Sequence, residues 1–283
     1  MPADQPVAAS VPVPFARAAE GHPVAVKAPP PPHVARPVMY HRWSHITFVH
    51  WRYPAALVQA MVPDRLTVET FDGSAWIGLT LFLMEDVRAP AVPAVPWLSR
   101  FPEINVRTYV RDDGGRRGIW FLSLDAARLP AVLAARAGYW LPYFWSDMTV
   151  RVAGDRVTYR CRRLWPGAGA RCDADVEMGP PLAEAERDEL AHFLTARYRL
   201  FTVVAGRLAA AEAEHREWPL CHARIRHLDQ DLVQRAGLPA PGEPSTVHAS
   251  PGVPTRIGMW RHVPAGTTPR RTVRRGRGRS SWG

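Results

Sequence analysis

The feature that most restricts the fold is a pair of strand-like stretches joined by a tight turn. FPEINVRTYV (101–110) and RGIWFLSLDA (117–126) flank the turn residues Asp112 to Arg116. Asp-Gly and Gly-Gly pairs favour reversals, so the two stretches are predicted to pair as an antiparallel hairpin. The second stretch is apolar on both faces through its middle, and such a strand has to be covered on both sides.

The first stretch carries a polar side chain at every second position. Glu103, Asn105 and Arg107 share one face beside the apolar partner strand. This row can line a pocket, form an ion-paired network in a core, or face solvent, and its apolar partner favours burial. Glu103 and Arg107 lie about 13 Å apart along a strand, so each needs another partner.

Three further stretches also alternate with the period of a strand. Residues 147–152 and 156–163 are predicted to form a half-buried hairpin, and 171–178 another strand. The last carries Asp173, Asp175 and Glu177 on one side. Such a row can bind a metal, but it more often forms a solvated outer face, the interpretation that we prefer.

Helices are predicted at fewer places. They cover 54–62, 130–140, a longer segment after Pro181 with an apolar stripe reaching Tyr198, and a segment from Asp229 to before Gly237. Strands that do not alternate regularly with helices favour an antiparallel or mixed, barrel-like sheet. The predicted class is α+β, mostly β.

The ends of the chain differ from the middle in composition. Residues 1–38 hold ten of the 29 prolines, and the last 23 residues contain seven arginines and no acid. Without those arginines the formal charge of +10 falls to +3, so the basic character belongs mainly to the tail. We predict a proline-rich disordered arm at 1–38, one domain at 39–262, and a basic disordered tail at 263–283. Nucleic-acid binding through this tail is an alternative function.

Several other classes of protein are disfavoured. The longest central apolar stretch, Trp76 to Met84, is far shorter than the ~20 residues of a membrane helix, and no secretory signal is visible. Cys161, Cys172 and Cys221 form no metal-binding motif, which predicts a cytoplasmic protein without a structural metal. No nucleotide-binding loop occurs, and no cofactor is predicted. Oligomeric state is not fixed by these patterns.

Residues 41–52 are predicted to form a strand with His41, Trp43 and His45 on one face. Two histidines at this spacing can share a metal, but packing beside tryptophan is favoured. We retain His45 as a ligand-binding candidate, since a neutral imidazole is a natural base near pH 7.

FPEINVRTYV, GIWFLSLDA, the WPL at 218–220 and the HASPGV at 248–253 together resemble the YqjF-like family of uncharacterised bacterial proteins. The resemblance runs in order from about Tyr40 to His262. That family is similar in fold to acetoacetate decarboxylases, which implies a mixed sheet curved into an open cone or barrel around a cavity, with helices outside.

Decarboxylases of that fold use a buried lysine in a G-x-P-K-K-like run to form a Schiff base. The matching run here is GYWLPYFW (138–145), with Tyr143 and Phe144 where the lysines stand, and the one lysine of the chain is Lys27. Schiff-base decarboxylation is therefore not expected. The resemblance places Glu103 on a cavity-lining strand.

The sequence thus predicts a protein that binds a small carboxylate- or carbonyl-bearing molecule through Glu103, Asn105, Arg107, Tyr143 and His45. Whether it is an enzyme is left open. The alternative is a non-Schiff-base lyase or other enzyme in which Glu103 or Tyr143 transfers a proton.

Overall fold

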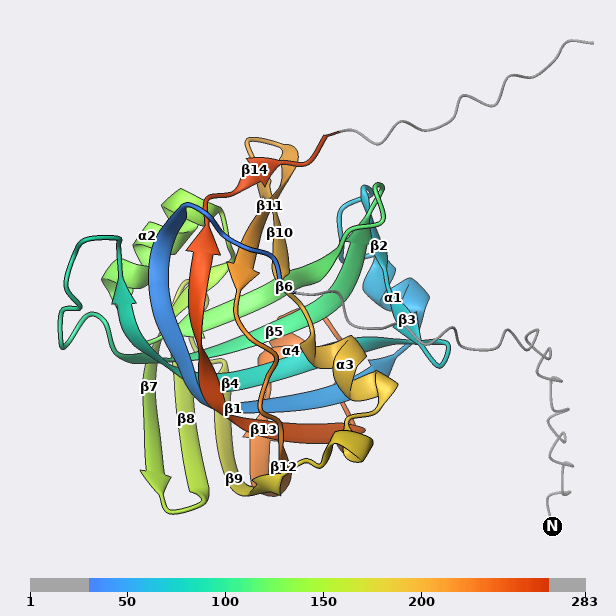
Figure 1. The fold of residues 1–283 in the computed structure, drawn as a ribbon. Helices are drawn as coiled ribbons and strands as arrows, with labels where there is room; N and C mark the ends of the chain where they lie inside the picture. Colours follow the sequence, from blue (N-terminus) through green and yellow to red (C-terminus); the bar gives the residue numbers. More distant parts are fainter. Residues whose placement is uncertain (1–30, 265–283) are drawn as a thin grey trace, which may run out of the picture.

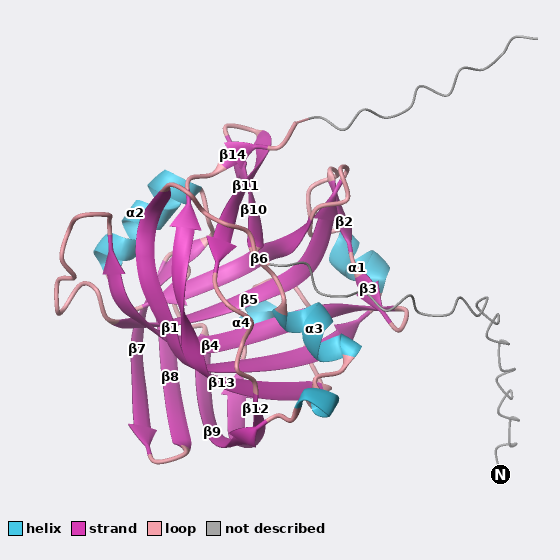
Figure 2. Cartoon of the chain, viewed as in Figure 1, coloured by secondary structure: helices cyan, strands magenta, loops and turns pink. Residues whose placement is uncertain are grey.

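A computed structural model describes residues 31–264, and fourteen strands in this range form one sheet (Figures 1 and 2). The strands are β1 Pro37–Tyr53, β2 Leu66–Val68, β3 Thr70–Phe71, β4 Ser74–Arg88, β5 Phe101–Asp112, β6 Arg117–Ala126, β7 Tyr143–Ala153, β8 Arg156–Trp165, β9 Arg171–Pro181, β10 Arg199–Val204, β11 Arg207–Glu214, β12 Cys221–Gln230, β13 Thr246–Gly258 and β14 Arg261–His262. The helices are α1 Ala55–Gln59, α2 Leu129–Tyr139, α3 Glu189–Thr195 and α4 Leu232–Arg235, with a 3₁₀ turn, η1, at Glu184–Glu186. The predicted mostly β class is confirmed.

The sheet is mixed and curved, and its pairings close two rings that share a wall of five strands, β13, β1, β4, β5 and β6. Strands β7, β8, β9 and β12 complete a ring of nine. Strands β10 and β11 complete a second ring of seven through their pairing with β6 and β13. The curvature is visible in Figure 1, where α2 lies to the left of the strands and α1 to the right.

The shared wall explains why some strands are buried on both faces. One face of β5, with Ile104, Val106 and Val110, packs into a large core with residues of β1, β4, β8 and β9. Its other face looks into the seven-stranded ring. Strand β4 is buried on both faces for the same reason.

The predicted hairpins are confirmed, with β5 antiparallel to β6 and β7 antiparallel to β8. Two helix predictions need correction. Helix α3 ends at Thr195, because the chain turns there into β10, so Tyr198 is outside it. Asp229 does not begin a helix: it belongs to β12, opposite Asp173 of β9, and α4 begins after Asp231.

The predicted arm and tail lie largely outside the described residues, as does Lys27. Within the described margins, Val34 and Val263 are buried against the domain. None of the helices between residues 31 and 264 is long and apolar enough to cross a membrane.

Candidate functional site

The polar row of β5 is buried. Glu103 and Asn105 are each 4% exposed and Arg107 is 8% exposed. Of the three alternatives that the alternation left open, solvent exposure is therefore wrong. The two that remain, a pocket and an ion-paired network, differ in whether protein groups satisfy these side chains.

The neighbouring strands decide what lies beside the row. Across β4, Glu103 faces Phe82, Asn105 faces Thr80 and Arg107 faces Gly78. On β6 the register shifts between Phe121 and Ser123, so Leu122 has no partner on β5. This β-bulge lets both Phe121 and Leu124 point to the same side as the polar row, where they line one cavity.

Tyr143 reaches the row through a long-range parallel pairing. Strand β7 begins at Tyr143, which pairs with Leu124 of β6, and Leu124 in turn pairs with Asn105. The Tyr143 hydroxyl donates a hydrogen bond to Oε2 of Glu103 at 2.9 Å. Burial raises the pKa of Glu103 to about 7, although the hydrogen bonds from Tyr143 and Asn105 act in the opposite direction.

One polar atom of Arg107 and one of Asn105 lack a hydrogen-bond partner in the described chain. Nε of Arg107 and Oδ1 of Asn105 are buried without a hydrogen bond, and no described carboxylate forms an ion pair with Arg107. Its guanidinium lies 5.4 Å from the Phe48 ring centre and 5.8 Å from that of Tyr109. Buried polar groups usually find a partner, so these atoms need a ligand or water.

A nearby ion pair shows how this fold satisfies a buried charge with protein groups alone. Arg163 donates to both carboxylate oxygens of Asp125, at 2.8 and 2.6 Å, and Ser146 donates to the same carboxylate at 2.7 Å. Both charged groups are fully paired in this bidentate geometry. Arg107 in the polar row of β5 has no such carboxylate partner in the described chain, which favours a pocket over an ion-paired network.

The row faces a cavity of about 120 Å³ inside the seven-stranded ring. Its other walls are mainly apolar and aromatic. They include Trp43, Ile46, Phe82, Phe121, Leu124, Leu141 and Trp218. Apolar walls with a few convergent polar groups are the usual form of a small-molecule site.

Two polar residues lie beside Arg107: Tyr109, which continues the alternation of Glu103, Asn105 and Arg107, and His50, which the sequence did not single out. His50 Nε2 and the Tyr109 hydroxyl are 2.6 Å apart, and both residues are fully buried. Burial and then the charge of Arg107 lower the pKa of His50 well below its ordinary value, so its ring is neutral. Gly78 makes room for the pair, because a Cβ there would lie 3.1 Å from both side chains.

The HASPGV stretch holds Trp43 against the cavity. Gly252 lies opposite Ser44 with φ 116°, and a Cβ on it would lie 1.9 Å from the Trp43 carbonyl oxygen. Trp43 stacks on Trp218 of the WPL stretch, with 5.7 Å between the ring centres. The two distant motifs thus meet in one wall.

His45 is placed differently from the other candidates. The pairing of β1 with β4 shifts register between Ser44 and Thr47, and His45 has φ 46° in this β-bulge. The predicted alternation of His41, Trp43 and His45 fails here, and His45 is not among the residues that line the cavity, whereas His41 and Trp43 are. A bulge of this kind leaves no signal in the alternation.

The acidic row of β9 is ion-paired. Asp173 pairs with Arg160, Asp175 with Arg156, and Glu177 with Arg226. Among residues 31–264, no group of three or more His, Cys, Asp or Glu side chains is arranged to hold a metal ion. The row forms the outer face that we preferred.

Comparison with known proteins gives the same fold and family. Residues 40–254 match the model of DUF2071, a family described as an uncharacterized conserved protein. The Uncharacterized protein YqjF of Bacillus subtilis (strain 168) is 34% identical over 211 residues, which cover 75% of this chain and 86% of that protein.

Solved structures of similar fold include decarboxylase-like enzymes. An acetoacetate decarboxylase-like enzyme from Sphingomonas wittichii RW1 has a TM-score of 0.55 at 14% identity, covering 81% of this chain and 94% of that chain. The enduracididine biosynthesis enzyme MppR, complexed with pyruvate, has a TM-score of 0.55 at 16% identity, covering 80% and 90%. At these identities the likeness establishes the fold, and the expected cone-like sheet is confirmed.

Proposed function

Because this chain belongs to the DUF2071 family of uncharacterized conserved proteins, its function has to be inferred from the cavity, and we propose that the cavity binds a small carboxylate- or carbonyl-bearing organic molecule. The observation that carries this proposal is the buried Nε of Arg107, a donor that has no acceptor among the described residues. A bound carboxylate accepts from Arg107. Protonated Glu103 or the Asn105 amide donates to a carbonyl oxygen.

The size of the cavity limits the ligand. Its volume of about 120 Å³ is close to the ~150 Å³ of an engineered cavity that holds benzene. A molecule of about six non-hydrogen atoms is therefore expected, and pyruvate has that size. MppR has been solved in complex with pyruvate, which supports the choice of a 2-oxo acid as the first probe.

The chemistry differs from that of a Schiff-base decarboxylase. No lysine occurs between residues 31 and 264 of the sequence, and the matching run contributes Tyr139, Leu141 and Tyr143 to the cavity. Arginine stays protonated and a phenol cannot form an iminium, so neither replaces the amine nucleophile. We also propose a cytoplasmic location, in keeping with the free thiols of Cys161, Cys172 and Cys221.

Titration calorimetry with pyruvate tests the proposal. Arg107→Met keeps the length and apolar contacts of the side chain but removes its charge, and we expect it to weaken binding roughly 10- to 100-fold, the value of a charge-assisted hydrogen bond. Arg226→Met is the matched control, because Arg226 pairs with Glu177 outside the cavity. Unchanged affinity in a folded Arg107→Met protein, or no binding of any small oxo acid by the wild type, would overturn the proposal.

A second candidate function, proton transfer, rests on the pKa of Glu103. A carboxyl with a pKa of about 7 that also accepts from a tyrosine is suited to general acid–base work near neutrality. Exchange of the methyl protons of pyruvate in D₂O, followed by NMR, distinguishes turnover from binding. Exchange that Glu103→Gln abolishes supports an enzyme, whereas binding without catalysed exchange contradicts this candidate.

A further inference from the structure

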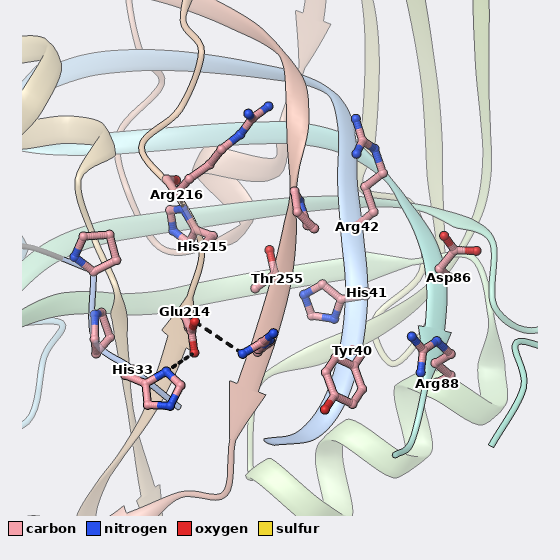
Figure 3. A pocket seen from close by; sticks show the side chains of 14 residues that line it. His33, Tyr40, His41, Arg42, Asp86, Arg88, Glu214, His215, Arg216 and Thr255 are labelled. Atoms are coloured by element: carbon pink, nitrogen blue, oxygen red, sulfur yellow. Dashed lines mark hydrogen bonds and ion pairs between the residues drawn. The ribbon is translucent and has the colours of Figure 1, made fainter. Parts of the chain in front are cut away.

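A second hollow opens beside the start of β1, and His41 lines both this hollow and the inner cavity (Figure 3). Its volume is about 740 Å³, well within the ~300–1,000 Å³ of small-molecule pockets. It is lined by the first part of β1, the ends of β4 and β11, the segment after β11, and β13. The binding function proposed above does not use this groove.

The groove carries excess positive charge. Four arginines and two acids line it. Glu214 is already engaged, since it accepts from the Val34 amide at 2.7 Å and pairs with Arg256 at 3.6 Å. The guanidinium groups of the other three arginines, Arg42, Arg88 and Arg216, form no ion pair or hydrogen bond with another residue of the described range. Arg88 only lies over the Tyr40 ring, 4.8 Å from its centre.

Two unpartnered polar side chains form the floor of the groove. His41 and Thr255 are direct neighbours across β1 and β13, and Figure 3 shows them at the centre of the ring of charged residues. His41 is 5% exposed and Thr255 is 3% exposed. Both ring nitrogens of His41 and Oγ1 of Thr255 are buried without a hydrogen-bond partner in the described chain.

These floor groups are neutral and can both donate and accept hydrogen bonds. Burial, and then the neighbouring His215, lower the pKa of His41 to about 3, so its ring is neutral and offers one donor and one acceptor. Thr255 adds a hydroxyl. Leaving three such buried atoms unsatisfied costs free energy, which a bound molecule recovers.

We propose that this groove is a second ligand site, which takes a phosphate-bearing small molecule. The guanidinium groups of Arg42, Arg88 and Arg216 hold the phosphate oxygens, and His41 and Thr255 bind the polar part next to it. Arginine matches phosphate because its planar fork donates two parallel hydrogen bonds. His41 lines both the groove and the inner cavity, so it forms the partition between the two sites.

Titration calorimetry of the full chain with pyrophosphate tests this site. We expect the double variant Arg42→Met/Arg216→Met to bind pyrophosphate at least tenfold more weakly, with pyruvate binding unchanged. Arg107→Met has the opposite pattern, so failure of one site is distinguishable from failure of the other. The basic tail is present in every variant, and a difference between variants therefore reports the groove.

Two further arms complete the test. Arg226→Met, which removes one charge outside the groove, is expected to leave pyrophosphate affinity unchanged; an equal loss in this control would attribute binding to overall charge and overturn the site. His41→Phe keeps the ring packing and removes both nitrogens, and we expect at least a threefold weaker affinity. Equal affinities of wild type and double variant, or succinate binding as tightly as pyrophosphate, would also overturn the proposal.

Discussion

Strands β5 and β9 carry the same pattern, a charged or polar residue at every second position, and use it in opposite ways. The β5 row is buried, and Arg107 has no carboxylate partner in the described chain. The β9 row is paired with arginines, and its Asp173 side chain is 42% exposed. Alternation alone therefore does not distinguish a site from an outer face.

The difference follows from how many rings each strand belongs to. Strand β9 lies in the nine-stranded ring only, so one face packs into the core through Cys172, Ala174 and Val176, and the other faces outward. Strand β5 lies in the wall that both rings share, so its second face also looks inward. A polar row on a shared wall has to be satisfied by a ligand, by water or by other protein groups.

The largest test of this contrast is the pH dependence that Glu103 gives to stability. Its pKa is about 7 in the folded chain against 4.5 for an unperturbed glutamate, so between these pH values the folded state binds a proton that the unfolded state has lost. The free energy of unfolding therefore falls as pH rises from 4.5 to 7, by roughly 3 kcal/mol in total. Glu103→Gln should remove this loss, as measured by urea unfolding at several pH values.

Asp175→Asn is the matched change on β9, and its sign is opposite. Hydrogen bonding from Thr158, with the arginine contacts, lowers the pKa of Asp175, so its contribution to stability is present above its ordinary pKa and disappears on acidification below it. The Asn variant should lose stability at neutral pH and approach the wild type in acid.

The prediction for Glu103 fails if the free energy of unfolding of Glu103→Gln falls with pH from 4.5 to 7 as steeply as that of the wild type. Glu103 would then not be held as a buried acid.

A smaller effect is expected from Tyr143→Phe. This change removes the hydrogen bond that Tyr143 donates to Glu103. Because that bond favours the charged carboxylate, the pKa of Glu103 should rise further without it. The free energy of unfolding should fall by about 1 kcal/mol, the value of one hydrogen bond. Carbon-13 NMR of the glutamate carboxyl follows the titration directly. Tyr139→Phe serves as the control, since Tyr139 also lines the cavity but donates to the Gly258 carbonyl at 3.1 Å. A titration midpoint that moves equally in both variants would contradict the role of Tyr143.

Local patterns predicted the parts of the fold that depend on near neighbours in sequence. The turn at Asp112 to Arg116 fixed the β5–β6 hairpin, and the apolar partner strand correctly predicted that Glu103, Asn105 and Arg107 are buried. The period of two is a property of each strand alone, so it can be read without knowing the rest of the chain.

The parts that could not be predicted depend on distant pairings and irregular strands. Tyr143 meets Glu103 only because β7 runs parallel to β6, and periodicity does not show which strands become neighbours. The β-bulge after Ser44 removes His45 from the face of His41, because one extra residue breaks the alternation. That both ring nitrogens of His41 lack a hydrogen-bond partner in the described chain is likewise visible only once the positions of all neighbouring residues are known.

The smallest expected effect is that of Asp173→Asn on β9. Asp173 lies 3.4 Å from Arg160, and both side chains are more than two-fifths exposed, so water and salt screen the pair. Exposed pairs of this kind contribute ~0–1 kcal/mol, and we expect a loss of at most about 0.5 kcal/mol by urea unfolding, declining further in 1 M salt. Pyruvate and pyrophosphate affinities should stay at the wild-type values. A loss of ligand binding in this variant would mean that the outer row of β9 takes part in function. Membership of the shared wall would then not distinguish a strand that carries a site, such as β5, from one that does not.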